Sequence, residues 1–471
     1  MTDDPRPPTV TAPSPNMTSP SVRRLPELTR TAMWSTALAI AVLTAAVVVA
    51  LWWPATAGLN GPDLVKARLD ALKVGLSVGV GSGGVVALYL AWRRQHSTEV
   101  ALSQQERTAD DLRADAVERR ITELYLKAAE LLGSEKAPVR LSGLYALERL
   151  AQDNGSQRQT IVNVLCAYLR MPYEAPGPRP GDAEQREQHR AVIQEREVRL
   201  TAQRLLCDHL KPGRDIAYWG RLDLDLTGAH LIDFNLDDAL IGTGILRNVT
   251  FAGRTDFTRA VFSGHTDLMG ACFTGKALFV RTTFTKGAWL SDTTFQGPAT
   301  FASTTFKEHA DFREATFKQS SKFTEMVFTQ SAAFSKATFG GETYFHGTTF
   351  TQDTAFTGAT FADSILFVEA DFNGRAAFDN THFRGDAFFT RATFTRNALF
   401  GEATFTREAH FANTTFLREV SFGKATFTKD PIVAGANFAR PPVFTEATLG
   451  GKPYSAAEKT STYSPKPSQP D

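Results

Sequence analysis

The sequence has few cysteines and no excess of either charge, and each absence argues against a class of function. It contains three cysteines in 471 residues, Cys166, Cys207 and Cys272, an odd number without metal-ligand spacing. We expect reduced thiols in a cytosol-facing protein, with no chemistry assigned to them. The 51 basic and 50 acidic residues balance, so charge gives no reason to expect a nucleic acid partner.

Catalytic and cofactor motifs are also lacking once their context is considered. Gly79 to Gly84 matches GxGxxG by its letters, but it lies in an apolar span with no preceding strand, which favours helix packing. Gly270 to Ala277 resembles a phosphate loop, but has Ala where Ser or Thr would bind Mg²⁺. Five histidines show no ligand spacing: His265, His309, His346, His382 and His410. We therefore expect no catalytic residues, no cofactor and no metal, although a solenoid could in principle assemble a catalytic group across its coils.

Phenylalanine, in contrast, is abundant and regularly spaced. From Phe251 to Leu449 an apolar residue recurs after alternating steps of six and five residues, giving 37 positions that we call slots. Phenylalanine fills 33 of them, and the exceptions are Leu268, Leu290, Val433 and Leu449. A fixed 11-residue period over nearly half the chain predicts a solenoid.

The step lengths select the kind of solenoid. The residue two before a slot is Ala, Thr or Ser at 31 of the 37 positions, so a large ring alternates with a small residue. Steps of five and six would scatter the rings around an α-helix, and an odd step would reverse the face of a flat strand. The remaining solution is a coil with a corner between slots. Each short side then points its Phe and its small residue inward, and each turn rises about 4.8 Å.

Upstream, the stretch LTGAHLIDFNLDDALIG repeats with a pure five-residue step. It resembles the pentapeptide-repeat family, whose units read A-(D/N)-L-x-x, as in Ala229-His230-Leu231 and Ala239-Leu240-Ile241. The resemblance implies a mainly β fold, a right-handed quadrilateral β-helix over residues 222–449. The Phe-rich section departs from the family by one inserted residue in every second side, which gives 22 residues per coil and about ten coils, roughly 50 Å in length.

The N-terminal part predicts a membrane hairpin at residues 31–94. Residues 32–53 and 74–92 are uncharged and long enough to cross about 30 Å of hydrocarbon. Aromatic residues suited to the interface sit at their ends: Trp34, Trp52, Trp53, Tyr89 and Trp92. Arginines precede the first span and follow the second, so we expect a two-pass protein of the inner (plasma) membrane with both termini in the cytoplasm.

Two details of the hairpin bear on this topology. Ala55-Thr56-Ala57 resembles a signal-peptidase site, but the preceding apolar run is too long for a usual signal core, so an uncleaved span is favoured. Gly75, Gly79 and Gly83 recur every four residues and predict close helix packing, within the hairpin or between protomers. The first-span partners expected for them are Ala37, Ala41 and Ala45.

The remaining segments have simpler interpretations. Residues 1–30 and 450–471 are predicted disordered tails. Residues 95–172 predict a cytoplasmic helical region with a break at Gly133-Ser134, where Ser134 is a candidate cap. Its string VRLSGLYALERLA resembles a segment that precedes pentapeptide repeats in bacterial membrane proteins. Residues 173–221 predict a linker and a helix that caps the first coil and covers its strand edge.

The residues expected to face outward from the coil give the only indication of a binding surface. The residue before alternate slots is usually Thr, which predicts two Thr ladders on opposite sides. On a third side, 22-residue steps give Leu278, Thr300, Lys322, Tyr344, Leu366, Phe388 and His410. Leu278, Tyr344, Leu366 and Phe388 are the candidate partner-contact residues, and the last three would form one exposed apolar strip. We hypothesise that it binds a partner, a second copy or the cap of the same chain; simple ladder stacking is the alternative.

These expectations combine into a membrane-anchored cytoplasmic scaffold without catalysis. Its partners would be the lipid bilayer and an unidentified protein or a second copy. Imitation of duplex DNA against type II topoisomerases, an activity of some pentapeptide-repeat proteins, is one alternative. It requires an acidic surface, whereas residues 226–449 contain 20 basic and 22 acidic residues, which argues against it. A structural oligomer within the membrane is the other alternative.

Overall fold

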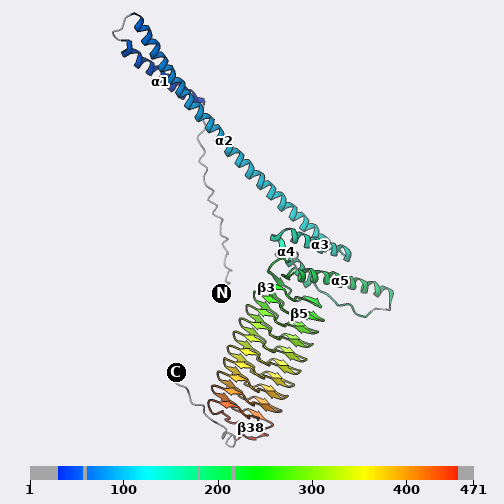
Figure 1. Cartoon of the computed structure of the whole chain (residues 1–471). Coiled ribbons are helices and arrows are strands. Elements are labelled where there is room, and N and C mark those ends of the chain that lie inside the picture. Colours follow the sequence, from blue (N-terminus) through cyan, green and yellow to red (C-terminus); the bar gives the residue numbers. More distant parts are fainter. Residues whose placement is uncertain (1–29, 57–60, 179–180, 214–217, 455–471) are drawn as a thin grey trace, which may run out of the picture. The chain divides into compact units, whose positions relative to one another are not determined.

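The computed structural model describes residues 30–56, 61–178, 181–213 and 218–454 (Figure 1). The chain divides into two compact units, residues 1–117 and 118–471, which we describe separately. The predicted tail at residues 1–30 lies outside the described residues except for Arg30, and so does Ala57 of the predicted cleavage site.

The first unit consists of α1 (Arg30–Thr56) and most of α2 (Pro62–Leu132). The helices contain two apolar segments long enough to cross a membrane, Met33–Pro54 and Val65–His96. α2 continues without interruption for 71 residues. The second span and the first helix of the predicted cytoplasmic region are therefore one element, with no break at residue 94. Helix-favouring Ala, Leu, Gln, Glu and Arg residues dominate its polar half.

The second unit begins with the end of α2 and three further helices, α3 (Ala137–Asp153), α4 (Arg158–Arg170) and α5 (Ala183–Asp208), with the 3₁₀ turn η1 (Gly155–Gln157) before α4. α2 ends at Leu132, just before Gly133. The expectation for Ser134 was wrong, because Lys136 is the N-cap residue of α3. The Ser134 hydroxyl instead accepts a hydrogen bond from the Lys136 N–H at 3.2 Å.

A buried arginine holds α4 and α5 together. Arg199 is 1% exposed and donates to the carbonyls of Leu169 and Met171 at 3.1 and 2.7 Å, at the C-terminal end of α4. It also pairs with Glu195 at 2.8 Å, and Glu195 accepts from Tyr168. Carbonyls at a helix end have no partner within the helix, so a guanidinium group with several donors suits this position.

The solenoid has four sides per coil, and its parallel strands pair in register with strands 22 residues away along the Phe-rich section (Figure 1). Side 1 contains β6 (Val261–Phe262), β10 (Thr283–Phe284), β14 (Thr305–Phe306), β18 (Val327–Phe328), β22 (Thr349–Phe350), β26 (Asp371–Phe372), β30 (Thr393–Phe394), β34 (Thr415–Phe416) and β37 (Asn437–Phe438). Side 2 contains β7 (Thr266–Asp267), β11 (Ala288–Trp289), β15 (Ala310–Asp311), β19 (Ala332–Ala333), β23 (Thr354–Ala355), β27 (Ala376–Ala377), β31 (Ala398–Leu399) and β35 (Val420–Ser421). The strands β1 (Leu222–Asp225) of the first coil and β3 (Leu240–Ile245) of the second coil are each shared by sides 1 and 2.

The other two sides form separate sheets. Side 3 contains β2 (His230–Ile232), β4 (Thr250–Ala252), β8 (Cys272–Phe273), β12 (Thr294–Phe295), β16 (Thr316–Phe317), β20 (Thr338–Phe339), β24 (Thr360–Phe361), β28 (His382–Phe383), β32 (Thr404–Phe405), β36 (Thr426–Phe427) and β38 (Thr448–Leu449). Side 4 contains β5 (Thr255–Asp256), β9 (Ala277–Leu278), β13 (Ala299–Thr300), β17 (Ser321–Lys322), β21 (Thr343–Tyr344), β25 (Ile365–Leu366), β29 (Ala387–Phe388) and β33 (Ala409–His410). The predicted four-sided β-helix is confirmed.

The slots form the core of every coil. Phenylalanines on one side stack face to face along the solenoid axis, as Phe317, Phe339 and Phe361 do with ring centroids 5.0 and 4.8 Å apart. Rings of adjacent sides meet edge to face, as Phe339 and Phe345 do at 6.3 Å. The small residue two before a slot is also fully buried, for example Ala337. Large and small side chains therefore fill each layer together, as the alternation in the sequence predicts.

The unequal steps correspond to two kinds of corner. A five-residue step passes through a tight turn whose second residue has positive φ, such as Glu314 at 60° and Glu325 at 55°. A six-residue step has a wider bend instead, in which the inserted residue is placed, for example Gly264 after β6. The insertion thus follows sides 1 and 3 only, and the slot side chains of all four sides still point into the core.

Buried threonines explain why Thr replaces Ala at many of the small positions. The Thr282 hydroxyl is buried and donates to the carbonyl of Phe257 at 2.8 Å, and Thr381 does the same to Phe356 at 2.9 Å. The same bond is made by Thr293, Thr304, Thr348 and Thr414. Each of these six bonds joins successive coils and satisfies the hydroxyl of the threonine that makes it.

The helices and the solenoid meet at the first coil through two glutamine side chains. Gln203 of α5 donates to the Ile232 carbonyl at 2.8 Å and accepts from the Ile232 N–H at 2.9 Å. Gln159 of α4 makes the same pair of bonds with Asp223, both at 2.9 Å. Each amide therefore takes the place of a peptide group in the strand that the first coil lacks. The predicted capping helix contributes Gln203, and α4 shares this role.

The far end of the solenoid is closed by part of the predicted tail. Leu449 of β38 pairs antiparallel with Lys452 of β39 (Lys452–Pro453), so residues 450–454 are ordered rather than disordered. The Tyr454 ring then lies 4.7 Å from the ring of Phe444 and 6.0 Å from that of Phe427. Residues 455–471 lie outside the described residues.

Candidate functional site

The two Thr ladders lie where the sequence predicts them, on opposite sides of the coil. Side 1 places Thr283 beside Thr305, and side 3 places Thr316 beside Thr338. At the last coil the Thr448 hydroxyl donates to Thr426 at 3.4 Å. These sides present short β-branched side chains on a flat sheet, which suits strand pairing and requires no ligand.

Side 4 brings the candidate contact residues into one line. Tyr344, Leu366 and Phe388 are direct neighbours on three successive coils, and all three are half-buried. The Phe388 ring stacks on the imidazole of His410 at 4.4 Å, and the Lys322 ammonium lies 5.8 Å from the centroid of the Tyr344 ring. Leu278 is separate from this line, because Thr300 and Lys322 occupy the two coils between Leu278 and Tyr344.

The line extends one coil further than the sequence analysis placed it. His410 bridges to Ile432, which is 38% exposed. The same 22-residue step that selected the other members also selects Ile432. We call the set Tyr344, Leu366, Phe388, His410 and Ile432 the side 4 strip.

Acidic residues flank the side 4 strip. The Tyr344 hydroxyl donates to Glu342, and this bond, together with burial and the charge of Glu342, raises the pKa of Tyr344. Glu408 pairs with His410 at 3.1 Å and with Lys429 at 3.1 Å. The strip is thus an apolar line with a charged border, the arrangement found at many protein contact surfaces.

The other sequence candidates do not assemble a site. Gly79 to Gly84 lies inside α2, and Gly270 to Ala277 forms a turn followed by β8 and β9 without a helix. The described residues include no cluster of three potential metal ligands. His309 contacts Ser331 at 2.8 Å, and His346 pairs with Glu369 at 3.7 Å, so these imidazoles belong to the bonds between coils.

Two of the three cysteines, Cys166 and Cys207, are structural. Cys166 of α4 and Cys207 of α5 are buried in the bundle of α3, α4 and α5, which we call the helical cap, and burial raises the pKa of each thiol to about 12. Since the thiolate is the nucleophile, both should react very slowly. Iodoacetamide at pH 8 should leave Cys166 and Cys207 unmodified in the folded protein and label both after unfolding, as measured by peptide mass spectrometry. Rapid labelling of either thiol in the folded protein would contradict this assignment.

The membrane glycines fall into two groups. A Cβ atom on Gly75 would lie 2.0 Å from Val48, and one on Gly79 would lie 3.0 Å from Thr44, so both glycines pack against α1. A Cβ atom on Gly83 would meet nothing within 4 Å. The expected partners Ala37, Ala41 and Ala45 were therefore wrong for Gly75 and Gly79, because α1 presents the face with Thr44 and Val48.

Comparison with known proteins supports the fold. A family model described as pentapeptide repeats (9 copies) matches residues 279–327, 323–367, 345–393, 356–404, 367–414 and 389–433. No curated protein and no solved structure gives a significant match to the chain. The matched segments lie within the Phe-rich coils, and the fold is of the scaffold type. The Phe-rich solenoid of this chain is therefore a pentapeptide-repeat domain.

Proposed function

We propose that this protein is a non-catalytic scaffold, anchored in the inner membrane by α1 and α2, whose solenoid binds a protein partner through the side 4 strip. The observation that carries the proposal is the strip itself. Three large apolar side chains, Tyr344, Leu366 and Phe388, are stacked on the outside of a coil whose other Phe side chains, apart from those of the terminal coil, are buried. The three side chains are half-buried, so each still presents part of its apolar surface to solvent, and apolar surface lines with polar borders are typical of binding surfaces.

The exposure of the two apolar helices supports the membrane anchor. The share of side chains buried is 0% in Met33–Pro54 and 6% in Val65–His96, whereas the core helix of a soluble protein would be mostly covered. Trp34 and Trp53, near the two ends of α1, are 76% and 78% exposed. Such rings prefer the membrane interface. With the flanking arginines, this supports two passes with both termini in the cytoplasm.

The charges of the solenoid favour a protein partner over DNA mimicry. Acidic groups have basic partners one coil away, such as Glu308 with Lys286 at 2.9 Å and Glu369 with Arg391 at 2.7 Å. Glu314 and Lys336 form another such pair at 3.4 Å. A surface that imitates DNA needs uncompensated negative charge along its length. Inhibition of a type II topoisomerase therefore remains the less favoured function.

Replacing Tyr344, Leu366 and Phe388 together by Asp should abolish partner binding, because three carboxylates would have to be desolvated at the interface. The measurement is copurification of a partner of defined mass from native membranes, with photocrosslinking from position 366. The matched control replaces Thr294, Thr316 and Thr338 by Asp, which lie one before a slot on successive coils of side 3.

The outcomes of this experiment are distinct. Loss of the partner in the side 4 variant, with binding retained in the control and unchanged thermal unfolding in both, supports the proposal. If the variant instead changes only the oligomeric mass of the purified protein, the strip joins two copies and the proposed protein partner is wrong. Equal binding by all three proteins contradicts a role of the strip.

A further inference from the structure

α2 has two opposite faces along its membrane segment, and α1 covers only one of them. Gly75 and Gly79 face α1. Because each residue of an α-helix advances by about 100°, positions 77, 81, 84 and 88 lie on the other side. All four are exposed, and a Cβ atom on Gly81 or Gly84 would meet nothing within 4 Å. Leu88 is 73% exposed.

The second face continues in one register beyond the membrane segment. Steps of four and three residues alternate without interruption through Ser77, Gly81, Gly84, Leu88, Ala91, Gln95, Thr98, Leu102, Gln105, Ala109, Leu112 and Ala116, which we call the α2 seam. No seam residue is charged, although 12 of the 28 residues from 93 to 120 are Asp, Glu, Lys or Arg. An average spacing of 3.5 residues is the pattern of a coiled coil.

The side chains of the α2 seam are exposed in the single chain, apart from that of Ala109, which is half-buried. Leu102 is 56% exposed and Leu112 is 63% exposed. Helices in proteins gain most of their stability by packing an apolar face against a partner, because intrinsic propensity alone is marginal. The part of α2 between the membrane segment and the helical cap therefore has an apolar line whose burial would stabilise it.

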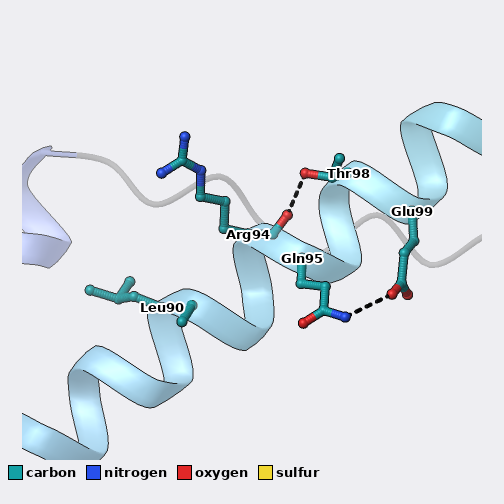
Figure 2. Close-up of a pocket in the computed structure, with 6 residues that line it drawn as sticks. Leu90, Arg94, Gln95, Thr98 and Glu99 are labelled. Atoms are coloured by element: carbon teal, nitrogen blue, oxygen red, sulfur yellow. Dashed lines mark hydrogen bonds between the residues drawn. The ribbon is translucent and has the colours of Figure 1, made fainter.

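The surface of α2 has a hollow on this seam. Figure 2 shows the hollow at Leu90, Arg94, Gln95, Thr98 and Glu99. The Thr98 hydroxyl donates to the Arg94 carbonyl at 2.8 Å, and the Gln95 amide donates to Glu99 at 3.2 Å. The polar groups at this part of the seam thus have partners within the helix, so a side chain from a facing helix can enter the hollow without leaving them unsatisfied.

The charges beside the seam identify the occupant as a second copy in parallel orientation. In a parallel pair, consider two seam residues that are three places apart, such as Gln95 and Thr98. The residue just before the first of them faces the residue just after the second on the other helix, five places later in the sequence. Arg94 then faces Glu99 of the second copy, and Asp115 faces Arg120 of the second copy. The two intervening pairs, Ala101 with Glu106 and Thr108 with Arg113, contain one charge each. No pair of like charges occurs.

We propose that α2 is a dimerisation helix, and that two copies of this chain join through the α2 seam in a parallel, in-register coiled coil that begins in the membrane. The proposal rests on the proposed membrane anchor, because insertion with a common topology makes two α2 helices parallel. Small residues allow close approach at Gly81 and Gly84. Gln95 and Gln105 are polar seam residues of the kind that fixes register. Two solenoids would then be held by one anchor.

Cysteine crosslinking of the full-length protein in native membranes tests the seam. Ala109→Cys is on the seam, whereas Ala114→Cys replaces the same residue type on the other side of the same helix. A disulfide needs Cβ atoms about 3.5 to 4.5 Å apart, so mild oxidation should give about tenfold more disulfide-linked dimer with Ala109→Cys than with Ala114→Cys. The unsubstituted chain supplies the background from its own cysteines, of which Cys166 and Cys207 are buried.

Each outcome decides the proposal. Dimer at position 109 with little at position 114 supports it, and the double variant Leu102→Asp with Leu112→Asp should then lower the dimer fraction counted by single-molecule photobleaching in bilayers. Equal crosslinking at both positions, or none at either, overturns it. Sedimentation with membranes after alkaline washing is measured in parallel. A chain that stays in the membrane but does not crosslink disproves the dimer alone, whereas a chain that is washed off disproves the anchor.

Discussion

Phe339→Ala should lower the free energy of unfolding by about 3 to 5 kcal/mol, the cost of a large cavity in a core that cannot collapse. Phe339 is fully buried between the rings of Phe317 and Phe361, which stack on it at 5.0 and 4.8 Å. Its carbonyl accepts a ladder hydrogen bond from Ala362 of the next coil, and its chain neighbours Thr338 and Gly340 donate to the preceding coil. The neighbouring rings therefore have no freedom to move into the space.

The damage should remain local, because each coil contacts only the coils beside it. Hydrogen exchange measured by mass spectrometry should show faster exchange in peptides around residues 317–361 and unchanged exchange near residue 251. Phe438→Ala is the control, since Phe438 is half-buried in the terminal coil and stacks on Phe416 alone, at 5.1 Å, among the described rings. It should cost less. Uniform loss of protection along the whole solenoid would show that the coils unfold as one unit.

The solenoid could be predicted from the sequence because one packing requirement is repeated at every slot. Two short-range facts, a Phe at a fixed spacing and a small residue two before it, determine the inside of each coil. The conformation of the corners was harder to predict from the sequence. Glycine or asparagine occupies the positive-φ position at some tight corners, such as Gly270 and Asn380, but Arg259, Ser303 and Glu325 occupy it at others although such residues seldom adopt positive φ. Residue preference therefore marked only some of the tight corners. The conformation of the others follows from closure of the coil and not from local preference.

The candidate site was predictable to the same extent. The 22-residue step placed Tyr344, Leu366 and Phe388 on one line, and it would have given Ile432 if continued past His410. In the membrane segment, however, α2 has small residues on two faces. The spacing of Gly75, Gly79 and Gly83 could not determine which face meets α1, because that choice depends on the shape of both helices.

The capping glutamines could not be found from the sequence, because a single Gln has no periodic signal. Their role follows from the strand edge that a solenoid must leave at its first coil. Gln203 and Gln159 each offer one N–H and one carbonyl to the backbone of a first-coil strand. They differ in burial, since Gln203 is 4% exposed and Gln159 is half-buried. This difference makes the two glutamines a matched pair for testing the cap.

Gln203→Leu should destabilise the protein by about 2 to 4 kcal/mol, because the buried N–H and C=O of Ile232 would both lose their partner with no water to replace it. Gln159→Leu should cost less, because water can reach the backbone of Asp223. Urea unfolding of the two variants measures the difference, and exchange of the Ile232 amide should rise only in Gln203→Leu. Equal losses of stability in both variants would mean that the glutamines act through packing of their aliphatic carbons.

The uncovered edge of Gln203→Leu should also promote association between chains at raised temperature, because an unpaired strand edge is a template for another strand.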